Sequence, residues 1–284
     1  MNLSDLHIFR TVMREGGITK AASVLNRVQS NVTTRVRQLE DDLGVPLFVR
    51  ENKRLLPTPA AHLLLDYSEK LIQLADQARA AVTSSEPAGL LRLGSMESTA
   101  AARLPKKLAA FHAQFPKVQL ELRTGATGRL VADVLAGKLE CALVGGPLND
   151  DRLDATEVFR EELVLVAPAG HPPIKRPSDV EPRTLLAFEA SCAYRQRLEQ
   201  WLASGKVVPE RIVELSSYHA MMGCVAAGMG IALAPVSLLN PLGEKRSLSI
   251  HHLPAKYADA PTLFVTRRDH RSPAAQALLQ NLLK

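Results

Sequence analysis

Polar side chains suited to hydrogen bonding with nucleic acid gather between residues 29 and 35. They are Gln29, Ser30, Asn31, Thr33, Thr34 and Arg35. Amides and hydroxyls bond to base edges, and a guanidinium group bonds to phosphate oxygens. Within residues 21–43, acidic residues appear only at positions 40 to 42. Because phosphate repels carboxylates and a helix N-terminus attracts anions, we expect the Gln29 end to meet DNA. An ordinary amphipathic helix with a solvated polar face is the alternative for this stretch taken alone.

Apolar residues in the same stretch have the spacing of a helix. They recur at steps of four, four, three and four, and they are Val28, Val32, Val36, Leu39 and Leu43. This spacing places them along one face, about a turn apart. We therefore predict a helix that buries this stripe and ends at Gly44, because Pro46 prevents its continuation.

Two shorter helices are predicted before this one. Ser4 can cap the first and Gly16 can end it, and Thr19 can cap the second. The small residues Ala21 and Ala22 allow the second helix to cross the third closely. Three helices with a short turn between the last two form a helix-turn-helix.

Two short strands are predicted after the third helix, over residues 47–50 and 55–56, around a tip that carries Lys53. Such a pair is typical of a wing. The sequence therefore predicts an all-α winged helix-turn-helix domain over residues 1–58.

A long helix is predicted next, from a cap at Thr58 to about residue 82. Its apolar residues recur every three or four positions, and they are Leu64, Tyr67, Leu71, Leu74, Ala78 and Val82. An apolar seam on a helix with no domain around it needs a partner, and a second copy of the helix is the simplest one. The alternative is packing against its own domain. We assign residues 59–89 to a linker that dimerises the chain and ends in a short hinge.

From residue 90 the pattern changes to short apolar runs that alternate with helical periods. Strands are expected at 91–94, 119–122, 141–144, 163–167, 185–188, 212–215, 231–234 and 263–266, and helices at 100–115, 128–136, 193–202, 219–227 and 274–283. This alternation indicates parallel strands joined by helices, in two α/β lobes. We expect lobe 1 at about 90–161 and 267–284, lobe 2 at about 162–266, and connections near Glu161 and Arg267.

Hydroxyl groups cluster in the loops that follow the predicted strands. Ligands of such sheets bind beyond the carboxyl ends of the strands, where helices begin. The candidate effector residues are Glu97, Ser98, Thr99, Thr124, Thr127, Gly146, Cys192, Tyr194, Tyr218 and His219. Hydroxyls beside free backbone N–H groups favour a small anion, most simply a carboxylate, and Glu97 could accept a bond from the ammonium of an amino acid. The alternative is that Ser98, Thr127 and Ser191 are only helix caps.

Composition narrows the remaining function classes. The net charge of +6 is too small to establish nucleic-acid binding by itself, although residues 1–58 carry +3. The three cysteines have no metal-ligand spacing and suit a reducing compartment. A thiol enzyme that uses Cys192 with His219 is conceivable, but no third orienting group can be named. We expect no cofactor, no metal, no membrane span and no secretory signal, and hence a cytoplasmic protein.

The order of residues in the first domain resembles the LysR-type transcriptional regulators. The matching residues are Ala21-Ala22, Leu25, Gln29, Leu39-Glu40, Leu43-Gly44 and Leu47-Phe48-Val49-Arg50. Two departures are Val28, where a serine is common, and Ala61, where a glycine is common. The resemblance implies that Gln29, Ser30, Asn31, Thr33 and Thr34 approach bases, while Arg35, Arg50, Lys53 and Arg54 approach phosphates or the minor groove.

The resemblance extends over the whole chain. It implies an antiparallel dimer through the linker helix, assembly into a homotetramer, binding to an interrupted inverted repeat in double-stranded DNA, and a periplasmic-binding-protein-like effector domain without enzyme activity. The stretches that begin at Gly94 and Ser217 are similar to the YofA-like subgroup. Cys192 stands at a place similar to the reactive cysteine of peroxide-sensing members, so a redox regulator is an alternative, although no resolving cysteine lies nearby. The second alternative is a small-molecule binding protein without a role in DNA binding.

Overall fold

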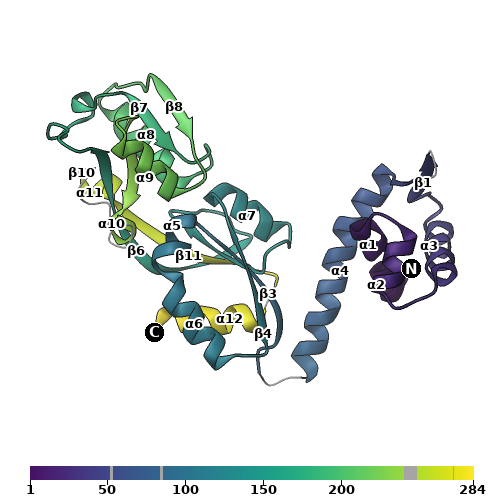
Figure 1. The fold of residues 1–284 in the computed structure, drawn as a ribbon. Helices are drawn as coiled ribbons and strands as arrows, with labels where there is room; N and C mark the ends of the chain where they lie inside the picture. Colours follow the sequence, from purple (N-terminus) through teal and green to yellow (C-terminus); the bar gives the residue numbers. More distant parts are fainter. Residues whose placement is uncertain (52–53, 84–85, 240–247, 271) are drawn as a thin grey trace. The chain divides into compact units, whose positions relative to one another are not determined.

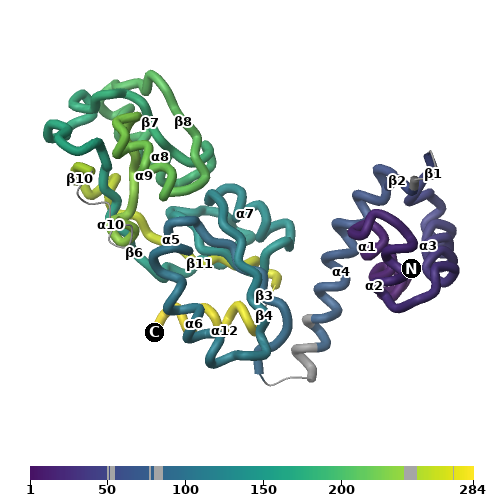
Figure 2. The backbone as a smooth tube through the Cα atoms, viewed as in Figure 1, coloured from purple at the N-terminus to yellow at the C-terminus, as the bar shows by residue number. Residues whose placement is uncertain are grey.

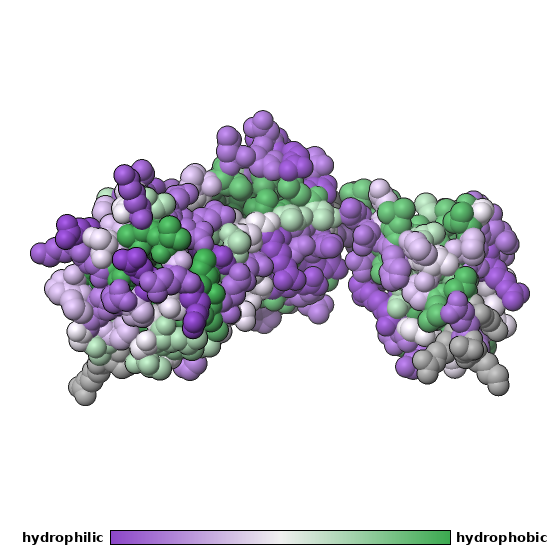
Figure 3. All heavy atoms as spheres, turned by 90° about the horizontal axis from the view of Figure 1, so that it is seen from above, coloured by the Kyte–Doolittle hydropathy of each residue, from purple (hydrophilic) through white to green (hydrophobic). Residues whose placement is uncertain are grey.

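The computed structural model describes residues 1–51, 54–83, 86–239, 248–270 and 272–284 (Figures 1 and 2). The chain forms two compact units, Met1–Ser85 and Glu86–Lys284. No helix among the described residues is both long and apolar enough to span a membrane. Mainly hydrophilic surface covers both units, with apolar patches on each (Figure 3).

The first unit is the predicted winged helix-turn-helix. Its elements are α1 (Leu3–Glu15), α2 (Ile18–Val24), α3 (Gln29–Leu43), β1 (Phe48–Glu51), β2 (Arg54–Pro57) and α4 (Pro59–Thr83). Gly16 and Gly44 end α1 and α3 in the left-handed conformation, at φ 71° and 69°, which a residue without Cβ adopts at low cost. The predicted caps at Ser4 and Thr19 are wrong. The Asn2 side chain caps α1 by accepting from the Asp5 N–H, and α2 begins after Gly17 without a side-chain cap.

The buried stripe of α3 is shorter than its periodicity suggested. Val32, Val36 and Leu39 are buried as predicted, against α1 and α2 and the wing. Val28 is 69% exposed and Leu43 is 36% exposed. The expectation for these two is wrong, because the neighbouring elements cover only the middle of the helix.

The helix α4 has one buried side and one exposed apolar side. The Thr58 hydroxyl accepts from the Ala61 N–H at 3.2 Å, as expected for a cap. Ser68 and Ile72 are buried, and Leu64 packs on the core of its own unit instead of lining an open seam. Other apolar side chains are exposed, namely Leu63, Tyr67, Leu71 and Leu74, at 62, 57, 39 and 58%. The side chain of Val82, also predicted for the seam, lies outside the described residues.

Lobe 1 of the second unit is a five-stranded sheet in the order β4-β3-β5-β11-β6. Its strands are β3 (Gly89–Ser95), β4 (Val118–Thr124), β5 (Cys141–Gly145), β6 (Leu153–Pro168) and β11 (Asp259–Arg267). The first three are mutually parallel, and β11 is antiparallel to both of its neighbours. One face is covered by α6 (Leu104–Gln114) and α12 (Pro273–Leu283), and the other by α7 (Thr127–Leu135). The short α5 (Glu97–Ala102) follows β3 directly.

Lobe 2 uses the second half of β6 as its own strand. This half pairs with β10 (Leu248–His252) and β9 (Ala232–Pro235), while β7 (Thr184–Ala187) pairs in parallel with β8 (Arg211–Glu214). The helical segments are η1 (Pro177–Asp179), α8 (Ala193–Ser204), α9 (Tyr218–Ala226), α10 (Val236–Leu239) and α11 (Ala255–Ala258). One apolar core joins them and includes Trp201.

The two lobes share β6 and meet again at the start of β11. The 16-residue β6 runs from lobe 1 into lobe 2 at Glu161–Leu163. We expected the return connection near Arg267, but Asp259 already pairs with Glu162 and the rest of β11 lies between β5 and β6. The chain therefore re-enters lobe 1 at Asp259. The sequence placed this return too late because β11 begins four residues before the apolar run that was predicted as a strand.

Candidate DNA interface and effector site

The first half of α3 presents polar side chains to solvent. Gln29, Ser30, Asn31 and Thr34 are exposed, and Ser30 and Thr34 lie on the side of the helix opposite Val32 and Val36. Thr33 is half-buried and its hydroxyl donates to the Gln29 carbonyl of its own helix at 2.9 Å. The side chains of Gln29, Ser30 and Thr34 are thus available to an outside partner, whereas the Thr33 hydroxyl and the Asn31 oxygen are already used.

Arg35 has a structural partner, which its sequence neighbours do not reveal. Its guanidinium lies 3.2 Å from a carboxylate oxygen of Asp5 in α1, and Asp5 is 7% exposed. A buried carboxylate needs such a counter-charge. Arg37, two positions further on, is exposed. Arg37 is therefore better placed than Arg35 to meet a phosphate.

The wing forms as predicted, with β1 and β2 antiparallel and Arg50 opposite Leu55. Lys53 lies outside the described residues, and only the backbone of Arg50 and Arg54 is described. Their proposed phosphate contacts stay predictions.

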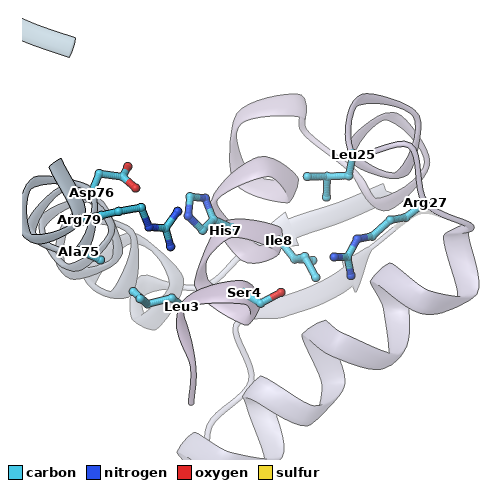
Figure 4. Close-up of a pocket in the computed structure, with 9 residues that line it drawn as sticks. All are labelled: Leu3, Ser4, His7, Ile8, Leu25, Arg27, Ala75, Asp76 and Arg79. Atoms are coloured by element: carbon cyan, nitrogen blue, oxygen red, sulfur yellow. The ribbon is translucent and has the colours of Figure 1, made fainter. Parts of the chain in front are cut away.

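Arg27, in the turn before α3, was missed by the sequence reasoning. Its guanidinium donates to the Asn31 side-chain oxygen at 3.3 Å. Arg27 and Arg79 also point into a hollow of about 370 Å³ above α1, with His7 beside Arg79 (Figure 4). Burial, followed by the charge of Arg10, lowers the pKa of His7. This side of the unit therefore carries guanidinium groups that neither helix periodicity nor the tip of the wing could indicate.

Glu40 fixes the wing to the recognition helix. One of its carboxylate oxygens accepts from the Leu47 N–H at 2.7 Å and from the Phe48 N–H at 3.0 Å. Leu47 is fully buried. Without the Glu40 carboxylate, its N–H would therefore be left without a hydrogen-bond partner in surroundings that exclude water.

Replacing Glu40 with Ala should therefore lower the unfolding free energy of the first unit by about 2 kcal/mol. Hydrogen exchange of the α1 and α3 amides would measure this loss. Glu40→Gln is the matched control, because it keeps an acceptor oxygen and should lose less. Equal protection in the parent and in Glu40→Ala would contradict the anchoring role.

Buried hydroxyls from both lobes meet beside the crossing strands. Ser98 and Thr99 come from α5, Tyr194 from α8, Tyr218 from α9 and Thr262 from β11, and all five are at most 3% exposed. Burial raises the pKa of Tyr194 and of Tyr218, and the Ser98 hydroxyl interacts with both phenols. We call these five residues the hydroxyl cluster. Four were predicted, and Thr262 was missed because it lies inside a strand without a motif.

Several polar atoms here have no hydrogen-bond partner among the described residues. They are the Thr99 and Thr262 hydroxyls, the Tyr194 hydroxyl and one carboxylate oxygen of Glu97. Ser98 and Thr262 face Tyr194, but at a geometry too poor for a full hydrogen bond. Burial also raises the pKa of Glu97. Unpaired buried polar atoms are rare in proteins, and the Tyr194 and Thr262 hydroxyls lie together here. A polar ligand would therefore gain hydrogen bonds at this place.

The other predicted effector residues lie elsewhere or are engaged. Thr124 and His219 are exposed. The Thr127 hydroxyl accepts from the Gly145 N–H at 3.1 Å, and the Gly146 carbonyl accepts from Arg197 at 2.9 Å. The capping alternative also fails, since Met96, Ala126 and Cys192 occupy the cap positions of α5, α7 and α8.

Cys192 is poorly suited to react. It is 8% exposed, and burial raises the pKa of its thiol. A thiol that stays protonated is a weak nucleophile. The buried Cys192 and the exposed His219 therefore do not support a thiol enzyme, and the same burial disfavours redox sensing.

The lobes are closed over the hydroxyl cluster. The Gly128 N–H of lobe 1 donates to the Ser191 carbonyl of lobe 2 at 3.2 Å. A Cβ on Gly145 would lie 2.7 Å from the Ala193 Cβ, so the absence of a side chain permits this approach. Entry of a ligand of any size therefore requires the lobes to separate.

Comparisons with known proteins cover both units. Residues 3–62 match the family described as bacterial regulatory helix-turn-helix protein, lysR family, and residues 84–284 match the LysR substrate binding domain. The chain is 40% identical to the HTH-type transcriptional regulator GltR of Bacillus subtilis over 99% of this chain and 96% of that protein. It is 38% identical to YofA of the same organism, over 95% and 93%.

Solved structures share the fold at lower identity. A full-length OxyR variant from Pseudomonas aeruginosa superposes with a TM-score of 0.74 at 20% identity, over 100% of this chain and 98% of that one. Full-length CbnR complexed with its target DNA gives 0.72 at 20% identity, over 99% of both chains.

Proposed function

The chain belongs to the LysR family of DNA-binding transcriptional regulators, and we propose that it binds an interrupted inverted repeat as a dimer joined through α4. We further propose that a small anion, held by the hydroxyl cluster, is its effector. The protein acts in the cytoplasm, as a homotetramer built from two such dimers, and it is not an enzyme.

The exposed start of α3 supports the base-reading role. Gln29, Ser30, Asn31 and Thr34 offer amides and hydroxyls, and the acidic end of the helix lies a dozen residues away. Asn31 is also held by Arg27, which limits its orientations and favours a defined contact.

A gel shift with the DNA upstream of the protein's own gene tests this role. Gln29→Ala should weaken operator binding by about 1 to 3 kcal/mol and relax the preference at one base position. Arg50→Ala should weaken binding to all sequences alike and reduce the salt dependence. Operator binding that is unchanged in both variants, across several salt concentrations, would remove the assignment. Absence of any shift with the parent protein would favour a binding protein without a DNA role.

The exposed apolar side of α4 supports the dimer. Leu63, Tyr67, Leu71 and Leu74 lie on one side of a 25-residue helix, away from its own unit. Burial of this stripe against a second copy removes apolar surface from water in both chains at once. A two-fold dimer also presents two copies of α3, which is what an inverted repeat requires.

The single observation that carries the effector proposal is the group of unpaired hydroxyls between the lobes. Hydroxyls donate hydrogen bonds to a carboxylate, and several donors at once offset the cost of removing the anion from water. Glu97 lies beside them with one unpaired oxygen, so an amino acid could add a bond from its ammonium group. We therefore propose a carboxylate, with amino acids as the first compounds to test.

Thermal-shift measurements of the full chain against carboxylates, amino acids and neutral amides test this proposal. We expect carboxylates to stabilise the parent, and we expect Tyr194→Phe and Thr99→Val to lose most of that stabilisation. Both changes delete a hydroxyl and little else. Thr124→Val is the control, because it makes the same deletion at an exposed position. Hits confined to neutral or cationic compounds would rule out the anion.

A further inference from the structure

Glu161 occupies the place where β6 leaves lobe 1. Its backbone pairs with Ala260 at the start of β11, so both connections between the lobes pass this residue. Its side chain is 4% exposed. The crossing point therefore contains a buried carboxylate, which is costly unless its oxygens are fully hydrogen-bonded.

Among the described residues, two side chains bond to this carboxylate, and they come from different lobes. Arg103, between α5 and α6 of lobe 1, donates from Nε at 2.6 Å and from Nη2 at 3.1 Å, one bond to each oxygen. Ser237, in α10 of lobe 2, donates its hydroxyl at 2.7 Å. Separation of the lobes would break at least one of these contacts and leave a buried charge with fewer donors.

The same carboxylate lies close enough to the hydroxyl cluster to act on it electrically. The Glu161 charge is the second cause, after burial, of the raised pKa of Tyr194. Tyr194 also contributes, after Glu161, to the raised pKa of the Arg103 guanidinium. An anion bound at Tyr194 would therefore lie within electrostatic range of both Glu161 and Arg103.

We propose that Arg103, Glu161 and Ser237 form a bracket that holds the two lobes closed and thereby controls access to the hydroxyl cluster. Glu161 is its central positioning residue. When an anion occupies the hydroxyl cluster and loosens the bracket, the two connections between the lobes change their conformation. This last link rests on the proposed effector site, whereas the bracket itself does not.

The native cysteines allow lobe opening to be measured without any ligand or DNA. Cys192 precedes α8 and is buried at the edge of the lobe 2 core, and its neighbours Ser191 and Ala193 lie against Gly128 and Gly145 of lobe 1. Separation of the lobes would therefore uncover the segment that holds Cys192. Cys141 is fully buried in the core of lobe 1 and reacts only when that lobe unfolds. Alkylation by iodoacetamide, followed residue by residue by mass spectrometry, thus separates opening from unfolding.

We expect Glu161→Gln and Ser237→Ala in the full chain to accelerate alkylation of Cys192 roughly tenfold while that of Cys141 stays at the parent rate. Ser237→Ala removes only one hydroxyl, so it keeps the test valid if Glu161→Gln folds poorly. Glu140→Gln is the matched control, because Glu140 is also a buried carboxylate held by an arginine, Arg92, but lies away from the lobe junction.

Three outcomes would overturn the bracket. They are an unchanged Cys192 rate in both variants, a rise in Cys192 and Cys141 together, and an equal rise of Cys192 in Glu140→Gln. A confirmed bracket combined with no stabilisation by any carboxylate would overturn only the effector proposal.

Discussion

If α4 joins two chains as proposed, Leu71→Asp should convert that dimer to a monomer and weaken operator binding by roughly 10²- to 10⁴-fold. Leu71 lies in the middle of the exposed apolar side of α4, between Tyr67 and Leu74, and is itself 39% exposed. A carboxylate placed there would have to be buried without a partner in the dimer, whereas the monomer leaves it in water. Loss of the dimer also separates two DNA-binding units, so the second half-site no longer binds as an intramolecular step.

Sedimentation velocity and operator titration of the same samples measure the two effects together. His62→Asp is the control, because it adds the same charge at an exposed position of the same helix that is not part of the apolar side. The control should stay dimeric. If folded Leu71→Asp keeps the assembly state of the parent, the exposed side of α4 does not carry the dimer.

Arg35→Ala should destabilise the first unit by about 1 to 2 kcal/mol, because the Asp5 carboxylate is buried but the Arg35 side chain is 40% exposed, whereas Arg37→Ala should leave its stability unchanged. The first change removes the counter-charge of Asp5, whose carboxylate is buried between α1 and α3. The second removes an exposed guanidinium that forms no ion pair with a buried group among the described residues. For DNA affinity we expect a direct effect from Arg37→Ala, with a smaller salt dependence of binding.

Hydrogen exchange of the α1 and α3 amides measures the stability of the first unit in the full chain. The fluorescence of Trp201, in lobe 2, reports the second unit separately. The two arginines lie two positions apart on one helix, so each serves as the control for the other. Equal stability of both variants, together with loss of DNA binding only in Arg35→Ala, would return Arg35 to the phosphate role implied by the family resemblance.

The contrast between these arginines shows what a periodic pattern contains. The spacing of Val32, Val36 and Leu39 predicted which side of α3 is buried, since a helix repeats regularly. It could not predict where the covering elements stop, which is why Val28 and Leu43 are exposed. It also could not reveal that Arg35 meets Asp5, 30 residues earlier, because that contact depends on how α1 crosses α3.

In the effector region too, some residues could be predicted from the sequence and others could not. Loops after strands are expected to converge in α/β sheets, and Ser98, Thr99, Tyr194 and Tyr218 were predicted from that rule. Thr262 and Glu161 lie within strands, where a polar residue usually faces solvent, so no local signal distinguishes them. Charged residues interrupt the first half of β6 at irregular positions, and for that reason only its apolar second half was predicted as a strand.

The position of β11 determines the order in which the second unit can fold during synthesis. Lobe 2 is continuous in sequence between β6 and Asp259, so its chain is complete as soon as that point has left the ribosome. Lobe 1 has to wait, because β11 lies between β5 and β6 and α12 covers its core with residues from the last dozen of the chain. Until then β5 and the first half of β6 are unpaired sheet edges, which are prone to pairing with other chains. Truncation before Asp259, which removes β11 and α12, should therefore leave a folded lobe 2 attached to an aggregation-prone lobe 1.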